Sequence, residues 1–290
     1  MKLLALVAAV LLLVGTGGLD HHPPAAASAD EVAPAALVRT YGVKINVDDM
    51  EKALAFYGGK LGFEIEDRGG YPERVLLKSG DREKLILNRV RRLEARGPAD
   101  TQLSFTLQVN DLDQAIARMK ALGVEFGEEG PRKEAVGNAI YVRDPFGRRI
   151  SLMHETVVKV EPFQEPRLYN FGFLVPDMQT GRAFYSAKLG FVVRSEKYLP
   201  LDLPLGHPDK TFAFMLHYRP GVRPVKSAYP RAAPFNTLVL ATPNLPAAVK
   251  ELTAHGVKFL TTHPQPGALG SYVVFADPFG NVSELLEVTQ

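Results

Sequence analysis

Residues 47–63 read VDDMEKALAFYGGKLGF, and residues 175–191 read VPDMQTGRAFYSAKLGF. The two stretches share Asp-Met, Phe-Tyr and Leu-Gly-Phe at identical spacing. Further along the chain, Asp144-Pro145-Phe146-Gly147 recurs as Asp277-Pro278-Phe279-Gly280. Such consistent matches indicate an internal duplication, and a repeat constrains the fold more strongly than any single residue. The second copy carries a net insertion in Pro/Gly-rich sequence, at Leu199–His207 or Pro220–Pro234.

Each copy is itself double, because Val109-Asn110-Asp111-Leu112 and Leu122-Gly123-Val124 repeat the same pattern around a second helix. Arg39–Val47 alternates apolar and polar residues, which predicts a half-buried strand. Asp49 then stands where the N-cap of an amphipathic helix, Met50–Lys60, belongs. Three strands follow, so the expected unit is strand–helix–strand–strand–strand. The chain holds four such units, at roughly 38–96, 101–156, 167–219 and 234–289.

Composition excludes several classes of function. The 290 residues include no cysteine, which rules out disulfides, thiolate catalysis and thiolate metal ligands. The formal net charge is only +2, and basic residues are interspersed with acidic ones. This pattern is not that of a nucleic-acid-binding protein.

The N-terminus predicts export. Lys2 precedes an uncharged apolar run from Leu3 to Val14, and Ala27-Ser28-Ala29 has the small-residue pattern of a cleavage site. We therefore expect a signal peptide at 1–29, a linker at 30–37 and a periplasmic or extracellular protein that leaves the membrane after cleavage. The alternative is an uncleaved N-terminal membrane anchor, although the apolar run is short for a membrane span.

The repeated motifs resemble those of the vicinal oxygen chelate superfamily, which includes glyoxalase I, bleomycin-resistance proteins and extradiol dioxygenases. The resemblance covers residues 38–289. It implies an α+β fold of four βαβββ units, paired into two cup-shaped mixed sheets that surround ligand cavities. On this resemblance we expect one module at 38–156, a linker at 157–166 and a second module at 167–289. The matching motifs are structural, so they leave the reaction open.

Metal-dependent members of the superfamily place His, Gln or Glu side chains in the cup. The corresponding positions here carry Gly42, Ser104 and Ser151 in the first module and Asn170, Thr237 and Glu284 in the second. Met215 and His217 could also point into the second cup. No cofactor is therefore expected. The alternative is a divalent metal ion held by Glu284 and His217, with Asn170 as a further ligand.

Strand alternation predicts what lines each cup. The first module would present a polar face, either solvated or suited to a carboxylate or phosphate, with Arg149 as bidentate donor and Lys44 beside it. The second would surround Asn170, Thr237 and Glu284 with apolar side chains, as small-molecule sites do. In such a pocket Glu284 would suit proton transfer at a carbon next to a carbonyl. Ordinary core packing that fills the cup is the alternative.

Three functions remain open from the sequence. The first is an exported protein that holds a small organic molecule in the second module, with Asn170, Thr237, His217, Met215, Lys44 and Arg149 as ligand-binding residues. The second is a metal-dependent lyase, isomerase or dioxygenase with Glu284 as catalytic residue. The third is a non-catalytic interaction protein. Because duplication can replace the dimerisation of single-module relatives, a monomer is favoured.

Overall fold

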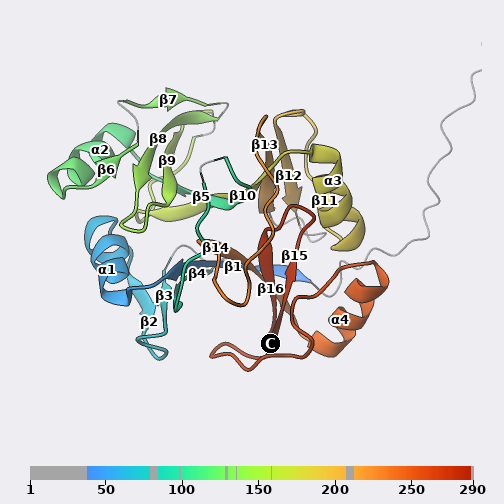
Figure 1. Cartoon of the computed structure of the whole chain (residues 1–290). Coiled ribbons are helices and arrows are strands. Elements are labelled where there is room, and N and C mark those ends of the chain that lie inside the picture. The colour runs from blue at the N-terminus through green and yellow to red at the C-terminus, as the bar shows by residue number, and fades with distance from the viewer. Residues whose placement is uncertain are drawn as a thin grey trace, which may run out of the picture. The chain divides into compact units, whose positions relative to one another are not determined.

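The computed structural model describes residues 38–78, 84–97, 99–127, 130–134, 136–157, 159–206 and 212–288 (Figure 1). The expected signal peptide (1–29) and linker (30–37) lie outside these residues. No helix in the described ranges is long and apolar enough to cross a membrane.

The first unit shows how local sequence sets each element. Strand β1 (Arg39–Val47) leads into helix α1 (Met50–Leu54), which widens into the π-helical segment η2 (Ala55–Lys60). The Asp49 side chain accepts a hydrogen bond from the Lys52 backbone N–H at 3.0 Å, satisfying a donor that the helix start leaves free. Gly62 ends the helix with a φ of +89°, a conformation that favours glycine.

The remaining strands of the first unit are β2 (Ile65–Asp67), β3 (Arg74–Leu77) and β4 (Lys84–Arg89). The second unit comprises β5 (Leu103–Gln108), α2 (Leu112–Ala121), β6 (Glu125–Phe126), β7 (Arg132–Lys133), β8 (Gly137–Arg143) and β9 (Arg149–Glu155). The third comprises β10 (Arg167–Val175), α3 (Met178–Arg182), η3 (Ala183–Lys188), β11 (Val192–Val193), β12 (Asp202–Gly206) and β13 (Phe212–Tyr218). The fourth comprises β14 (Asn236–Thr242), α4 (Leu245–Ala254), β15 (Tyr272–Ala276) and β16 (Val282–Glu287).

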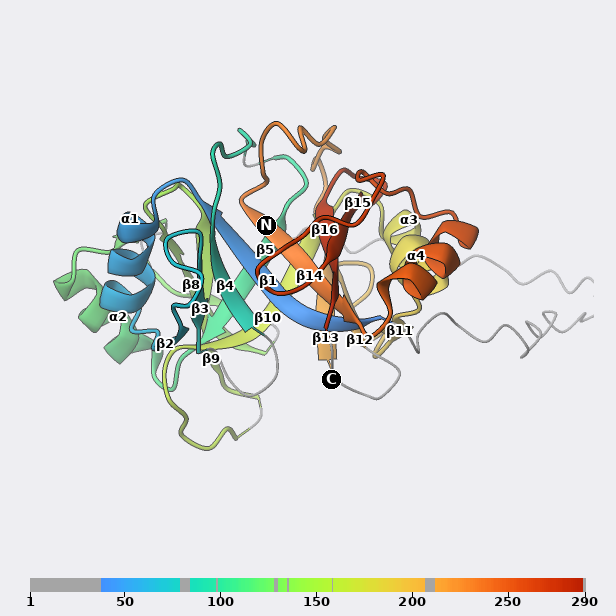
Figure 2. The ribbon, with the colours of Figure 1, turned by 90° about the horizontal axis from the view of Figure 1, so that it is seen from below.

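The described strands form two mixed sheets. One sheet has the order β15-β16-β14-β1-β4-β3-β2, and the other has the order β11-β12-β13-β10-β5-β9-β8-β6, with β7 paired to β8. Helices α1 and α2 lie on one side of the described structure, and α3 and α4 lie on the other (Figures 1 and 2). The α+β fold with two mixed sheets is therefore confirmed. The strand–helix–strand–strand–strand order holds in the first and third units, whereas the second unit has an additional short strand, β7, and the fourth has an isolated bridge between Phe259 and Phe275 in place of its second strand.

The pairing of the units corrects one expectation. We expected each cup to lie within one module, at 38–156 or 167–289. Instead β1 pairs antiparallel with β14, and β5 pairs antiparallel with β10, so each sheet joins one unit from each module (Figure 2). All four first strands offer the same alternation and the same free edge, so the sequence pattern cannot distinguish which two will pair.

The two repeated motifs meet in the core. The buried Tyr57 hydroxyl donates to Asp144 Oδ2 at 2.9 Å, and the buried Tyr185 hydroxyl donates to Asp277 Oδ2 at 2.8 Å. Each Asp also accepts backbone N–H groups of its own Asp-Pro-Phe-Gly turn; Phe279 donates to Asp277 at 2.9 Å. Burial raises the pKa of both tyrosines well above the usual value, so both remain hydrogen-bond donors. The motifs thus join helix to turn within each module.

Candidate functional site

The two sheets form two cups of different character. We name each by its central strand pair. The β1–β14 cup belongs to the sheet that joins the first and fourth units. The β5–β10 cup belongs to the sheet that joins the second and third units. Because side chains alternate along a strand, every second residue of these strands points into its cup.

The β1–β14 cup is filled by its own side chains. Apolar residues from both modules pack together there: Leu76, Ile86, Val239 and Leu286, with Tyr41, Leu269, Tyr272 and Val288 against them. Next to this cluster Lys44 Nζ lies 2.5 Å from Glu284 Oε2, and the lysine ammonium stands 5.2 Å from the centre of the Tyr272 ring. The alternative of ordinary packing therefore holds for this cup.

Thr237 is also occupied within the β1–β14 cup. The Asn46 side-chain amide donates to Thr237 Oγ1 at 3.0 Å and to the Pro234 carbonyl oxygen at 2.8 Å. Thr237, Glu284 and Lys44, three of the expected site residues, thus lie together but bond to partners in the chain. They offer little to an incoming ligand.

The β5–β10 cup contains a cavity of about 630 Å³. Its floor is built from the cup faces of β5, β10 and β9, and β12 and β13 form a side wall. Four of the expected ligand-binding residues line it: Arg149, Asn170, Met215 and His217. Apolar and hydroxyl groups of Ser104, Thr106, Met153, Leu174, Pro204 and Tyr169 also line it, together with the charged residues Glu134, Arg148, Asp202 and Arg219. The volume is that of an ordinary small-molecule pocket.

A histidine–aspartate pair stands in the side wall of this cavity. His217 on β13 and Asp202 on β12 are direct partners across the antiparallel ladder. His217 Nδ1 lies 2.8 Å from Asp202 Oδ1, and Arg219 Nη1 lies 3.6 Å from the same oxygen. Burial of Asp202 opposes its ionisation, but the hydrogen bond from His217 and the charges of His217 and Arg219 outweigh burial and lower its pKa. Asp202 is therefore a carboxylate at neutral pH.

Gly172 makes room for the His217 ring. A Cβ atom at Gly172 would lie 2.4 Å from the Met215 carbonyl oxygen and 2.7 Å from His217 Nε2. These separations are too short for any side chain, so the imidazole lies directly over the backbone of β10. The absence of a side chain at Gly172 thus lets the His217 ring pack against the floor of the cup.

Arg149 forms the opposite, cationic side of the cavity. Its guanidinium stacks on the Tyr141 ring, with the guanidinium carbon 4.0 Å from the ring centre, and Arg132 stands 4.2 Å from the same centre. Among the described residues, Arg149 has no ion-pair partner. An arginine held flat against an aromatic ring and lining a cavity is suited to bind a planar anion such as a carboxylate.

Tyr169 adds a neutral donor to the lining. Partial burial raises the pKa of Tyr169 to about 12, and the negative charge of Glu155 is the second-largest contribution to that rise. The hydroxyl therefore stays protonated throughout the physiological range.

Two connecting segments wall the cavity. Residues 90–101 link the first two units, and residues 219–234 link the last two. They pair with each other: Arg223 Nη2 donates to Asp100 Oδ1 at 2.9 Å, and the Thr101 N–H donates to the Arg223 carbonyl. Ala99 and the stretch 219–222 line the cavity.

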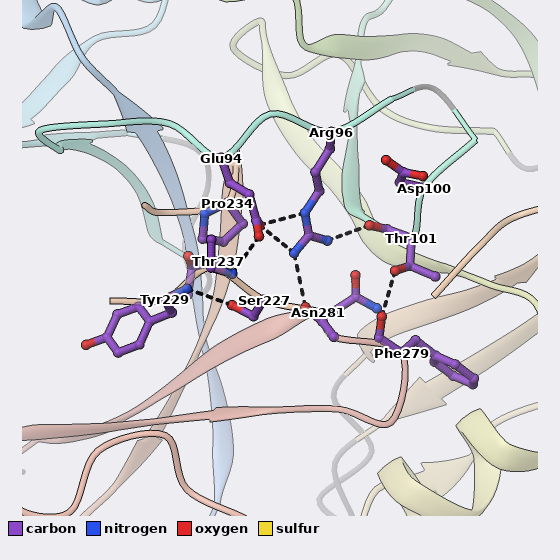
Figure 3. A network of polar contacts seen from close by, with 12 residues as sticks. Glu94, Arg96, Asp100, Thr101, Ser227, Tyr229, Pro234, Thr237, Phe279 and Asn281 are labelled. Atoms are coloured by element: carbon purple, nitrogen blue, oxygen red, sulfur yellow. Dashed lines mark hydrogen bonds and ion pairs between the residues drawn. The ribbon is translucent and has the colours of Figure 1, made fainter. Parts of the chain in front are cut away.

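A buried arginine anchors this wall. Arg96 donates to Glu94 Oε2 at 2.8 Å, to the Thr101 carbonyl at 2.5 Å and to the Gly280 carbonyl at 3.0 Å (Figure 3). The Thr101 hydroxyl donates to the Phe279 carbonyl at 2.8 Å. The wall is therefore tied to the Asp-Pro-Phe-Gly turn of the fourth unit.

The donors present do not fit the metal ion that the resemblance implies. The family positions regroup as Gly42, Thr237 and Glu284 in one cup and Ser104, Ser151 and Asn170 in the other. The first set contains a single carboxylate, already paired with Lys44, and the second offers only hydroxyl and amide oxygens. First-row divalent ions favour imidazole and carboxylate ligands. In the described part of the chain, no group of three or more His, Asp or Glu side chains forms a metal site.

The expected pair of metal ligands is also separated. Glu284 lies on β16 of one sheet, whereas His217 lies on β13 of the other. The cross-pairing of units is the cause, since it divides each module between the two cups. Asp202 is a site residue that the sequence reasoning missed, because Leu199–His207 was interpreted as inserted Pro/Gly-rich sequence. Its alternating run Asp202–Gly206 was the available signal.

Comparison with known proteins supports the fold. The family model "Glyoxalase/Bleomycin resistance protein/Dioxygenase superfamily" matches residues 39–152 and 167–285. The crystal structure of glyoxalase I from Zea mays is 20% identical, with a TM-score of 0.66, covering 86% of this chain and 92% of that one. A dioxygenase-like protein from Bacillus subtilis is 10% identical, with a TM-score of 0.58, covering 87% and 86%. A search of curated proteins found no match.

Proposed function

Because the chain belongs to the Glyoxalase/Bleomycin resistance protein/Dioxygenase superfamily, we propose that it holds a small, partly apolar organic molecule with an acidic group in the β5–β10 cup, without a divalent metal ion. The contrast between the two cups carries this proposal. One is packed with apolar side chains and a lysine–glutamate pair, whereas the other encloses about 630 Å³. An unfilled cavity of this size lowers the stability of the protein, because the side chains around it lose packing contacts.

The lining supports the ligand class. Arg149 supplies a cation without an ion-pair partner among the described residues, and its guanidinium carbon lies 4.0 Å from the centre of the Tyr141 ring. Met153, Met215 and Leu174 supply flexible apolar contacts, which suit a partly apolar ligand. Asn170 and Thr106 can donate hydrogen bonds to the ligand's neutral oxygen atoms. The apolar pocket that we expected around Glu284 is thus proposed around Asn170 and His217 instead.

A fluorescence titration with anilinonaphthalene sulfonate, an apolar anion, tests this proposal. We expect one dye molecule per chain, with binding weakened at least about tenfold in Leu174→Trp, which fills the cavity. Leu122→Trp, the same change at an exposed site, is the matched control and should bind as wild type does. Equal affinity of wild type and Leu174→Trp would contradict the proposal.

The charge of the probe tests the role of Arg149. Arg149→Gln should weaken binding of the sulfonate by about 1.5–3 kcal/mol, the usual contribution of a hydrogen bond to a charged group. An uncharged anilinonaphthalene should bind both proteins alike. Equal loss for both probes would show that Arg149 acts through packing.

We also propose that the protein is exported and monomeric. The sequence of residues 1–29 supports export, and the completion of both cups by one chain supports a monomer. Fractionation of expressing cells, followed by N-terminal sequencing, should give an exported form that begins at Asp30. Sedimentation should give the mass of one chain. Membrane-bound protein with an intact N-terminus would contradict cleavage and release. The mass of two chains would contradict the monomer.

A further inference from the structure

The pair of His217 and Asp202 in the cavity wall has the geometry of a proton-transfer device. We propose that His217, oriented by Asp202, takes a proton from the molecule bound in the β5–β10 cup and returns it, as the base of a metal-independent isomerase or lyase acting on a C–H acid. This inference rests on the proposed ligand-binding role of the same cavity. It moves the proton-transfer role expected of Glu284 to a residue in the other sheet.

Asp202 sets the tautomer of the ring. Its carboxylate lies 2.8 Å from Nδ1, and β12 and β13 hold the two residues opposite each other in the sheet. A carboxylate can only accept a hydrogen bond, so in the neutral form of the ring Nδ1 carries the proton and Nε2 carries the lone pair. The negative charge also stabilises the imidazolium that forms when Nε2 takes a proton. Asp202 is thus a positioning residue rather than a group that touches the ligand.

The environment of Nε2 leaves this nitrogen available to accept a proton. The His217 side chain is only 17% exposed, and it lines the cavity. The ring lies over Gly172, where a Cβ atom would be 2.7 Å from Nε2. Among the described residues, no group hydrogen-bonds Nε2. An oriented base that lines a ligand-sized cavity is the arrangement that general-base catalysis needs.

Neighbouring groups can accommodate the charge that develops. Ser104 is the direct strand partner of Gly172, and Asn170 lies two residues before it on the same face. Both line the cavity. The Ser104 hydroxyl donates to the Gly172 carbonyl at 3.2 Å, whereas the Asn170 amide can donate a hydrogen bond to a carbonyl oxygen of the ligand.

The step balances without a co-reactant. The C–H bond next to the carbonyl breaks, its electron pair moves to form an enolate, and Nε2 gains the proton. The imidazolium then returns that proton to the neighbouring carbon or oxygen, which gives an isomer. In a substrate with a leaving group on the next carbon, the same electron pair instead forms a carbon–carbon double bond and expels that group as an anion, which takes the proton from the imidazolium and so restores the base.

The base-promoted ring opening of nitrobenzisoxazole tests the proposal, because it needs a base and no cofactor. In this reaction a C–H bond breaks, a nitrile forms and the N–O bond cleaves to a coloured phenolate. Wild-type protein should turn over this probe at least about 100-fold faster than His217→Gln, the low end of what a positioned base contributes. His255→Gln is the matched control, since His255 lies at the end of α4 outside the cavity, and it should keep the wild-type rate.

Asp202→Asn tests the positioning role. The asparagine amide can donate to Nδ1, which places the ring proton on Nε2 and removes the lone pair. We expect a fall in the rate at saturating probe, with the half-saturating probe concentration unchanged. A purely structural role would alter both values. Asp202→Glu, which restores the carboxylate, should recover part of the rate.

Dye binding distinguishes a failure of the proposed base from a failure of the proposed ligand binding. Wild type that binds anilinonaphthalene sulfonate but opens the probe no faster than His217→Gln overturns the base and leaves the binding proposal standing. Wild type that binds no dye overturns the binding proposal itself. If His217→Gln does not fold, the wild type alone decides: its turnover must be blocked by saturating dye, and turnover that persists contradicts catalysis in the cavity.

Discussion

Lys44 Nζ lies 2.5 Å from Glu284 Oε2, and the two side chains are 14% and 6% exposed. Lys44 belongs to the first unit and Glu284 to the fourth, so the ion pair joins the two sequence modules across β14. Glu284 stands at a position where the family resemblance implies a metal ligand, and here its carboxylate is paired with Lys44. Burial of Tyr272, with the nearby negative charge of Glu284, raises the pKa of that tyrosine. The β1–β14 cup is thereby closed by a charge pair within the chain.

Breaking this pair should destabilise the protein. Lys44→Met leaves Glu284 buried without a partner, and we expect the free energy of unfolding to fall by about 3–5 kcal/mol. Urea titration of the variant measures the change. The double variant Lys44→Met/Glu284→Leu removes both charges and should recover most of the loss. A single variant as stable as wild type would contradict the assignment of this cup to the core.

The Tyr185–Asp277 bond should matter for stability as well. Burial raises the pKa of Asp277, although hydrogen bonds from Asn281, Tyr185 and Phe279 partly oppose that rise. Tyr185→Phe removes one of these donors and should lower the free energy of unfolding by about 1–3 kcal/mol. Tyr41→Phe is the control, because no described group hydrogen-bonds its hydroxyl. Equal stability of the Tyr185 variant and wild type would argue against a structural role for the Phe-Tyr motif.

Gly172 should tolerate no side chain. Gly172→Ala places a methyl group against the Met215 carbonyl and the His217 ring, and we expect a loss of about 1–3 kcal/mol in unfolding free energy from the resulting shift. Gly59→Ala is the matched control, since nothing lies within 4 Å of its added Cβ, and the helical position should gain about 0.5–1 kcal/mol. Thermal unfolding of both variants measures the contrast. Equal shifts in the two would contradict the packing of His217 on β10.

Asp202 should make stability depend on pH. Its pKa is lowered in the folded protein, so its contribution is present above the unfolded pKa and is lost as the pH falls through the folded pKa. The difference in unfolding free energy between wild type and Asp202→Asn should therefore shrink between about pH 5 and about pH 2. A difference that stays constant over this range would show that His217 and Arg219 do not hold the carboxylate.

Alternation and capping signals predicted the elements well. The strand Arg39–Val47 has the predicted limits, and the second helix, predicted between Asp111 and Leu122, is found at Leu112–Ala121, because both patterns are local and each extends over several residues. Arg149, Asn170 and His217 line one cavity, although the sequence analysis placed Arg149 in the cup of the first module and the other two in the cup of the second. Local patterns could do no more, since they fix which face a residue takes but not which strand lies beside it.

Which residues meet in the site depends on which units pair, and the sequence patterns do not determine that pairing. Glu284 and His217 were expected in one cup, yet they lie on different sheets because the first strands pair across the modules. Asp202 was missed because Pro204 and Gly206 obscured a short strand. The first failure concerns contacts between residues far apart in the chain, which no local periodicity encodes, whereas the second concerns a short local alternation that proline and glycine interrupt.

Mapping the bound dye by nuclear magnetic resonance tests the central claim most directly. Anilinonaphthalene sulfonate titrated into isotope-labelled protein should shift the backbone signals of the β5–β10 cup, among them Thr106, Asn170 and His217. The signals of Lys44 and Val239 in the β1–β14 cup should stay in place. Shifts confined to the β1–β14 cup, or no saturable shifts in either, would contradict the proposal that the chain binds its ligand between β5 and β10.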